Sequence, residues 1–330
     1  MQFPSTLQLS IENFIQKYGL SHLKAARKDL SERYRIGKQK QELMQSELHR
    51  IAYLLTRMPA TFAAISEVLK RVKIEAPHLS ITSLLDLGAG PGTASWAAKL
   101  AFDQLTDICL LEQDSQLIKM GKELMEADSL FTSSPPRWQM ADMTSTLLVE
   151  PSDMVIFSYS IGELPINSLS SIIEQVWQLT KGALVIVEPG TPKGFERIRL
   201  ARIKLIELGC FFLAPCPHQN SCPMANGDWC HFSTRLARSS SHRLLKEGEL
   251  GYEDEKFSYL VATKKQLAST KMRILRPPLK RSGHVHLKLC TAKGVQTPVI
   301  SKKEKALYQR AKKANLGDPF SFDSADHDLE

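Results

Sequence analysis

The chain has 330 residues, of which 43% are hydrophobic and 24% are charged, and its formal net charge is +8. These values are typical of a globular chain of about two domains, and they exclude a wholly disordered, collagen-like or coiled-coil protein. The sequence contains no apolar stretch of about 18 residues that could span a membrane, and its first residues resemble neither a signal nor a transit peptide. We therefore predict a cytoplasmic protein without membrane association.

The excess of positive charge lies in the second half of the chain. Residues 1–190 contain 18 basic and 21 acidic side chains, whereas residues 191–330 contain 25 and 14. Between Lys264 and Lys313 there are 15 basic residues and a single acidic one, Glu304, and the chain ends in the acidic tail DSADHDLE. Such a segment is typical of a surface that binds a polyanion, with RNA the leading candidate, although a solvated basic face without a partner is the alternative. The residues expected on this surface include Lys271, Arg273 and Arg276.

The pattern of apolar residues divides the chain into three regions. Residues 1–78 have apolar side chains at helical spacing, such as Ile51 and Leu54, and predict a helical N-terminal region. Residues 79–208 alternate short apolar runs with helical stretches, which predicts an α/β core with a parallel sheet covered by helices. Residues 209–330 lose the helical period and gather cysteines, prolines and basic residues, which predicts a separate cysteine-rich, RNA-binding region.

A glycine-rich turn follows the first predicted strand of the α/β core. The sequence LLDLGAGPGTASWAA passes from a buried strand through Gly88, Gly90 and Gly92 into a helix. Glycines let the backbone turn sharply and approach a ligand with no Cβ in the way. The spacing Gly-x-Gly-x-Gly, with Pro91 inside it, differs from the Gly-x-Gly-x-x-Gly of dinucleotide sites and disfavours an NAD-dependent oxidoreductase.

Three acidic residues stand near the ends of the predicted strands around this turn. Glu112 ends the second strand, where a carboxylate can accept hydrogen bonds from the two hydroxyls of a ribose. Asp142 follows the third strand, where it could hold an adenine amino group, and Asp86 is expected near the methionine end of the ligand. Together with the glycines, these positions resemble the S-adenosylmethionine site of class I methyltransferases, which have a Rossmann-like sheet.

The segment after the fourth predicted strand contains no recognisable catalytic motif. Its sequence, SYSIGELP, lacks the Asn-Pro-Pro-Tyr type tetrapeptide of amino-methylating enzymes. The polar groups expected near the site are Ser158, Tyr159 and Glu163. Cys216 follows a proline, as does the nucleophile of cytosine-5 methyltransferases, but it lies far along the chain from the expected methyl-donor site. We therefore assign no catalytic residue, and the sequence predicts neither an enzyme nor its absence.

The six cysteines of a predicted cytoplasmic protein do not indicate disulfides. Cys216, Cys222 and Cys230 are separated by five and seven residues in a segment rich in Pro, Asn and Gly, and Cys290 could supply a fourth thiolate. This spacing indicates a metal site, either a four-iron four-sulfur cluster or a zinc ion. The histidines available to a zinc ion are His218 and His231. The cysteines in apolar segments, predicted to be core residues, are Cys109 and Cys210.

Several segments of the chain resemble the mitochondrial small-ribosomal-subunit methyltransferase-like family, which also has bacterial members. They are the glycine turn, VEPGTPKGF at 187–195, the cysteine segment APCPHQNSCPMANGDWCHF, YEDEKFSYLV at 252–261 and the late Cys290-Thr291. The resemblance covers about residues 30–315. It implies a ribosome-associated protein that binds small-subunit rRNA during assembly. The four-iron four-sulfur ligands that it implies are Cys216, Cys222, Cys230 and Cys290.

Two functions are consistent with these observations. The first is an assembly or translation factor that binds the rRNA of the small ribosomal subunit and carries S-adenosylmethionine and an iron–sulfur cluster. The alternative is an active S-adenosylmethionine-dependent rRNA methyltransferase that holds its substrate with the basic second half of the chain. The missing catalytic tetrapeptide favours the first. In both cases the expected partner is the small subunit, and the protein itself is expected to be a monomer.

Overall fold

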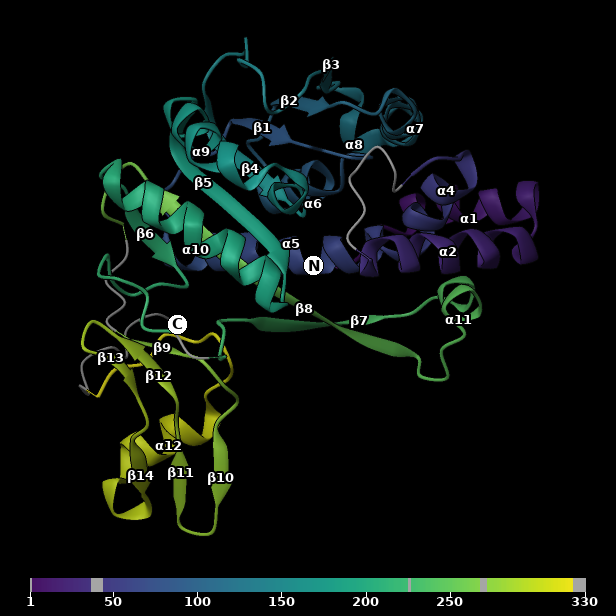
Figure 1. Cartoon of the computed structure of the whole chain (residues 1–330). Helices are drawn as coiled ribbons and strands as arrows, with labels where there is room; N and C mark the ends of the chain where they lie inside the picture. Colours follow the sequence, from purple (N-terminus) through teal and green to yellow (C-terminus); the bar gives the residue numbers. More distant parts are fainter. Residues whose placement is uncertain (1, 37–43, 225–226, 268–271, 323–330) are drawn as a thin grey trace.

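A mostly parallel sheet forms the centre of the protein. The computed structural model describes residues 2–36, 44–224, 227–267 and 272–322, and the acidic tail noted in the sequence lies outside them. The central sheet is eight-stranded, in the order β3-β2-β1-β4-β5-β8-β6 with β7 paired to β8 (Figure 1). Strands β1 to β5 are parallel, whereas β8 runs antiparallel to β5, β6 and β7. This topology confirms the predicted α/β, Rossmann-like class. The strands are β1 (Ser83–Leu87), β2 (Asp107–Glu112), β3 (Arg137–Met140), β4 (Ser152–Ser158), β5 (Thr180–Pro189), β6 (Phe211–Ala214), β7 (Phe232–Ala237) and β8 (Tyr252–Thr263).

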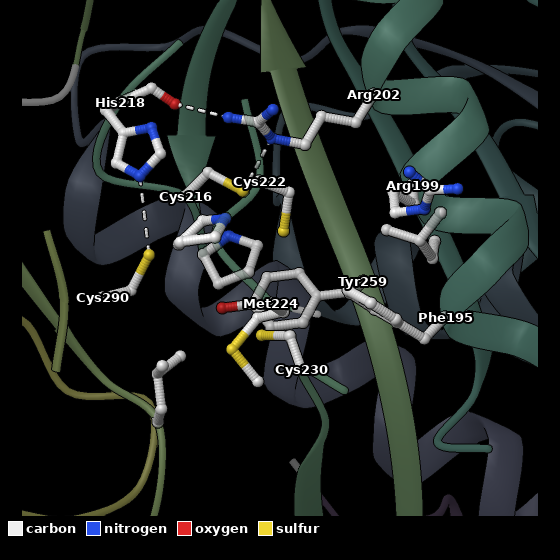
Figure 2. Close-up of a pocket in the computed structure, with 14 residues that line it drawn as sticks. Phe195, Arg199, Arg202, Cys216, His218, Cys222, Met224, Cys230, Tyr259 and Cys290 are labelled. Atoms are coloured by element: carbon white, nitrogen blue, oxygen red, sulfur yellow. Dashed lines mark hydrogen bonds between the residues drawn. The ribbon is translucent and has the colours of Figure 1, made fainter. Parts of the chain in front are cut away.

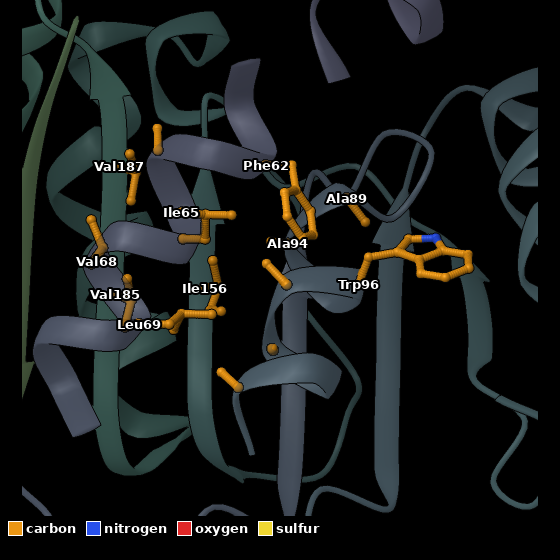
Figure 3. Close-up of a cluster of buried hydrophobic side chains, with 14 of the residues drawn as sticks. Phe62, Ile65, Val68, Leu69, Ala89, Ala94, Trp96, Ile156, Val185 and Val187 are labelled. Atoms are coloured by element: carbon orange, nitrogen blue, oxygen red, sulfur yellow. The ribbon is translucent and has the colours of Figure 1, made fainter. Parts of the chain in front are cut away.

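Helices cover both faces of this sheet. Successive strand residues point to opposite faces, so Val155 and Phe157 of β4 pack with α9 and α10, while Ile156 packs with α5 and α6 (Figure 3). On this second face Phe62 of α5 and Trp96 of α6 are fully buried. The strands are therefore apolar on both sides, as the short apolar runs of the sequence predict. The helices are α5 (Met58–Glu75), α6 (Thr93–Ala101), α7 (Ser115–Glu126), α8 (Ser129–Thr132), α9 (Leu169–Gln178) and α10 (Pro192–Glu207), with short 3-10 helices η1 (Ile161–Glu163) and η2 (Ile166–Ser168).

The N-terminal helices pack directly against the core. Helix α5 has buried residues along most of its length and lies on the sheet, while the helices before it pack against one another beside the core (Figure 1). Helix α4 begins after Ser46, whose side chain accepts the backbone N–H of His49, an N-cap. Arg50 of α4 then pairs with Asp114, the N-cap residue of α7, at 2.7 Å. The earlier helices are α1 (Ser5–Tyr18), α2 (Leu20–Arg35) and α4 (Glu47–Thr56).

The sheet continues past residue 208, where the sequence pattern placed a domain boundary. Strands β6 and β8 both follow that position, and β8 inserts between β5 and β6. The first half of β8 extends beyond the sheet as a two-stranded arm with β7, and α11 (Ser240–Lys246) at its end packs on α2 and α4. The sequence pattern did not indicate this continuation of the sheet, because the whole cysteine segment separates β8 from its partner β5. Local patterns do not reveal a pairing between such distant segments.

The residues that follow form a small C-terminal lobe. It contains two three-stranded sheets, ordered β10-β11-β14 and β13-β12-β9, and has its own apolar cluster that includes Val285, Ile300 and Tyr308. Within the described residues, no helix is both long enough and apolar enough to span a membrane. The elements are β9 (Met272–Ile274), β10 (Leu279–Arg281), β11 (His284–His286), β12 (Leu289–Thr291), β13 (Gly294–Gln296), β14 (Val299–Ser301), η3 (Lys302–Glu304) and α12 (Lys305–Lys313).

Candidate functional site

The glycine turn lies where the strand order of the sheet reverses. Strand β1 sits between β2 and β4, and ligands of open α/β sheets bind outside the carboxyl ends of the strands at this switch point. Gly90 has φ +58°, and a Cβ added there would meet nothing within 4 Å. By contrast, a Cβ at Gly88 would lie 2.7 Å from the Cβ of Ser160, and one at Gly92 would lie 2.3 Å from Cε of Met125. Gly88 and Gly92 thus permit close packing, while Gly90 borders open space that a ligand could fill.

Glu112 holds the end of β2 against this turn. Its side chain is fully buried, and its Oε2 accepts the N–H of Gly90 at 2.8 Å. Its Oε1 accepts the N–H groups of Gln113 and Asp114 at 2.8 and 2.9 Å. The structure therefore brings Glu112 and the glycine turn together, as the sequence predicts, and shows that the carboxylate also fixes the shape of the turn. Its contact with a ribose stays a prediction.

The other two predicted acids support neighbouring turns. Asp86 is buried, and its Oδ2 accepts the N–H and the hydroxyl of Ser95 at 3.1 and 2.8 Å, which ties β1 to the first turn of α6. Burial raises the pKa of Asp86 to about 7. Asp142 is exposed and accepts the N–H and the hydroxyl of Thr144, both at 2.8 Å, and these hydrogen bonds lower the pKa of Asp142. Their roles toward methionine and adenine stay predictions.

Two polar side chains after β4, those of Tyr159 and Ser160, are hydrogen-bonded within the protein. Tyr159 has the unusual φ of +56°, and its hydroxyl donates to Oε1 of Glu255 at 3.1 Å. Arg57 pairs with the same carboxylate at 3.0 Å and lies over the Tyr159 ring, 5.8 Å from its centroid. Burial raises the pKa of Tyr159 well above its usual value, which makes it a poor general base. The hydroxyl of Ser160 donates to the carbonyl of Leu87 at 2.9 Å. The sequence did not indicate Arg57 or Glu255, which come from distant elements.

Four cysteines line one cavity at the junction of the core and the C-terminal lobe (Figure 2). Cys216, Cys222 and Cys230 belong to the loop between β6 and β7, and Cys290 belongs to β12 of the lobe. These are the four predicted together from the sequence. The two cysteines predicted to be core residues are instead buried in the apolar interior: Cys109 and Cys210.

Arg202 of α10 positions the cysteine loop, a role that the sequence analysis missed. Its side chain is 3% exposed, and its Nε donates to Sγ of Cys216 at 3.3 Å. Its Nη2 donates to the carbonyl of His218 at 2.9 Å (Figure 2). The same Nη2 donates to the carbonyl of Asn220 at 2.6 Å. The available signal was its spacing, because Arg202 falls on the buried stripe of α10 between Ile198 and Leu205.

The surroundings of the four thiols suit a cationic metal centre. Burial raises the pKa values of Cys216, Cys230 and Cys290. The pKa of Cys290 rises to about 12, and neighbouring cysteines add to the shifts of Cys230 and Cys290. A metal removes this obstacle because it binds the deprotonated thiolates directly. Among the described residues, no three His, Cys, Asp or Glu side chains are close enough to hold a single ion. Whether the four thiols hold a four-iron cluster or a zinc ion stays a prediction.

The expectation that Arg273 lies on an RNA-binding surface is wrong. Its side chain is fully buried, and it donates to both carboxylate oxygens of Glu75 on α5, at 2.6 and 2.8 Å, and to the carbonyl of Pro215 at 2.9 Å. Arg276 is engaged as well, with Asp228 and the carbonyl of Trp229. Charge counting cannot separate such internal pairs from a solvated surface. Lys271 lies outside the described residues.

The sheet and the glycine turn together form the class I methyltransferase fold. The switch point carries the glycine turn after β1, with a buried acid at the end of β2, and β8 lies antiparallel between β5 and β6. The particular family follows from the sequence comparison. A family model described as mitochondrial small ribosomal subunit Rsm22 matches residues 47–321, and the chain belongs to this family.

Curated relatives and solved structures show what the chain is similar to. It is 27% identical over 297 residues to human "Ribosome assembly protein METTL17, mitochondrial". The matched region covers 84% of this chain and 64% of that protein. It is 26% identical over 326 residues to "Rsm22-cox11 tandem protein 2, mitochondrial" of Schizosaccharomyces pombe, covering 83% of this chain and 43% of that protein. The chain therefore spans between 43% and 64% of the length of these relatives.

Solved methyltransferase structures also overlap with this chain. Magnesium protoporphyrin IX methyltransferase from Synechocystis PCC 6803 overlaps with a TM-score of 0.42 and 11% identity, covering 78% of this chain and 97% of that one. Precorrin-6y C5,15-methyltransferase from Geobacter metallireducens also has a TM-score of 0.42, with 17% identity and coverage of 60% and 89%.

Proposed function

We propose that this protein binds the rRNA of the small ribosomal subunit and acts in assembly of that subunit or in translation, as a methyltransferase-like factor. The observation that carries the proposal is its membership of the Rsm22 family over residues 47–321. The name of the human relative, a ribosome assembly protein, and the basic charge of the second half support it. The cytoplasmic location and the monomeric state stay predictions.

Two bound groups belong to this proposal. The first is S-adenosylmethionine, proposed to bind beside Gly90 with contacts to Glu112, Asp86 and Asp142; the open space at Gly90 and its hydrogen bond to Glu112 support this. The converging thiols fit a four-iron four-sulfur cluster, which would join the core to the C-terminal lobe. The ligands proposed for it are Cys216, Cys222, Cys230 and Cys290. When bound, the first group supplies an activated methyl and the second an electron-storing metal centre.

An active rRNA methyltransferase is the second candidate. The same glycine turn supports it, because it would hold the methyl donor. The engagement of Tyr159 with Glu255 and Arg57 argues against it, since these groups occupy the end of β4, where a substrate would be oriented. We therefore favour the assembly factor.

Crosslinking the protein to RNA in cells, with sequencing of the bound sites, tests the function. We expect sites in small-subunit rRNA, a smaller pool of mature small subunits after deletion, and no methyl mark that disappears. A missing mark at a crosslinked nucleotide would instead establish the methyltransferase. Crosslinks confined to other RNAs, with normal subunits after deletion, would contradict both functions.

Gly90→Val is expected to abolish binding of S-adenosylmethionine in isothermal titration. A branched side chain would fill the space beside the turn, and the positive φ would add strain. The matched control is Gly209→Val in the turn between α10 and β6, because Gly209 also has a positive φ, +73°, and no atom within 4 Å of an added Cβ. The control should keep wild-type affinity. Equal affinity of the folded Gly90→Val protein would show that the donor site lies elsewhere.

A further inference from the structure

The sheet β10-β11-β14 has one covered and one open face. Directly paired residues of an antiparallel sheet point to the same side, so the register places Val285 and Ile300 on one face. Both are buried against α12, where they contact the cluster that contains Tyr308. The next residues of each strand, which point the other way, form a different surface. Figure 1 shows this sheet at the end of the lobe away from the central sheet.

The open face combines aromatic rings with exposed aliphatic side chains. His286 of the middle strand lies between its paired neighbours Leu279 and Val299, which are 50% and 54% exposed. His284 lies two residues earlier on the same face, and the two imidazole rings are 5.0 Å apart between centroids. Large exposed aliphatic groups beside two rings are typical of an interaction surface and not of a solvated one.

Positive charge surrounds these rings. Arg281 is paired with His284 on the same face and is exposed. Lys302 and Lys303 follow β14 directly and are exposed too. The nearby Glu304 accepts the N–H of Ser301 as part of a capping box, so its charge serves the local turn.

We propose that this open face, formed by Leu279, Arg281, His284, His286 and Val299, is a docking surface for single-stranded RNA. Unpaired bases stack on the imidazole rings and contact the two aliphatic side chains, while the phosphates lie against the arginine and the flanking lysines. Flat sheets with exposed rings bind unpaired bases in this way, and the bases of a duplex are not available for it. The inference rests on the proposed RNA binding and names the surface responsible.

Fluorescence anisotropy with a labelled single-stranded RNA of about 12 nucleotides, compared with the same sequence as a duplex, tests the proposal. The double variant His284→Ala, His286→Ala is expected to bind the single strand about 10-fold to 100-fold more weakly, with an unchanged salt slope, because stacking releases no counterions. The variant His284→Phe, His286→Phe should retain affinity, since phenylalanine also stacks. Thermal melting of each variant checks that it is folded.

The cationic part has a separate signature. Arg281→Gln with Lys302→Gln should lower the slope of log K against log salt by about 0.7 for each phosphate that the protein no longer neutralises. The matched control is Lys312→Gln with Lys313→Gln, which removes the same charge from exposed positions of α12 on the covered side. This control should bind as the wild type does.

The outcomes distinguish an error in the proposed docking surface from an error in the proposed RNA-binding function. Wild-type affinity in the folded double-alanine variant overturns the docking surface while leaving RNA binding intact. An equal reduction of affinity in the control pair would mean that overall charge alone holds the RNA, which also overturns it. Binding of a poly-glutamate peptide as tightly as RNA would assign the face to an acidic protein instead. A wild-type protein that binds no RNA contradicts the proposed function itself.

Discussion

Protein purified without oxygen is expected to be brown and to contain about four irons per chain, and Cys222→Ser or Cys290→Ser should remove both. The two substitutions test opposite sides of the junction, because Cys222 lies in the loop after β6 and Cys290 in the C-terminal lobe. Loss of the cluster should also loosen the lobe from the core. Limited proteolysis should then cut the lobe from these variants faster than from the wild type.

The cysteines of the apolar core provide the controls for this experiment. Cys109→Ala and Cys210→Ala should keep the iron and the colour, because both side chains are buried in the apolar cluster around β4 and α10 and neither lines the cysteine cavity. A colourless wild-type protein with one zinc per chain would contradict the iron–sulfur proposal. Full iron content in both serine variants would show that other residues hold the cluster.

Arg273→Met is expected to lower the free energy of unfolding by about 3–5 kcal/mol, the usual cost of removing one partner of a buried ion pair. Arg273 joins α5 through Glu75, the cysteine loop through the carbonyl of Pro215, and the end of the chain through the carbonyl of Gly317 at 3.2 Å. After its removal the buried Glu75 carboxylate keeps the longer ion pair with Arg71, at 3.7 Å. Denaturant unfolding followed by circular dichroism measures the change.

Two further variants make the Arg273 result specific. Arg281→Met removes the same charge from an exposed position and should change the stability by less than about 0.5 kcal/mol. Arg273→Met combined with Glu75→Leu removes both buried charges and should recover part of the stability. A change below about 1 kcal/mol in the single variant would show that the buried pair does not form in solution.

The order of strands and helices was predictable because the local spacing of apolar residues and glycines indicates each element. The run from β1 through the glycine turn into α6 lies within fifteen consecutive residues. A buried strand followed by Gly88 and Gly90 fits few structures other than such a turn. Glu112 was predicted at the end of the second strand, in the same ligand site as that turn. The hydrogen bond of 2.8 Å from Gly90 to its carboxylate agrees with that reasoning.

The partners of basic residues were not predictable in the same way. Arg202, Arg273 and Arg276 look alike in a charge count, yet one holds the cysteine loop, one is fully buried against Glu75, and one pairs with Asp228. Each partner lies far away in the chain or on another element. The contribution of an arginine to the free energy of folding depends on such contacts. Burying its charge without a partner destabilises the fold, whereas an exposed arginine contributes little.

By itself, the sequence determined the α/β class, the place of the glycine turn and the set of four cysteines, since each depends on residue type and short spacing. The tertiary structure alone decided that β8 completes the sheet, that Arg202 reaches Cys216, and that one face of the sheet formed by β10, β11 and β14 stays open. These features arise from packing between segments that are distant in the chain. Local periodicity carries no information about which distant surfaces bury one another, so only the folded arrangement could reveal them.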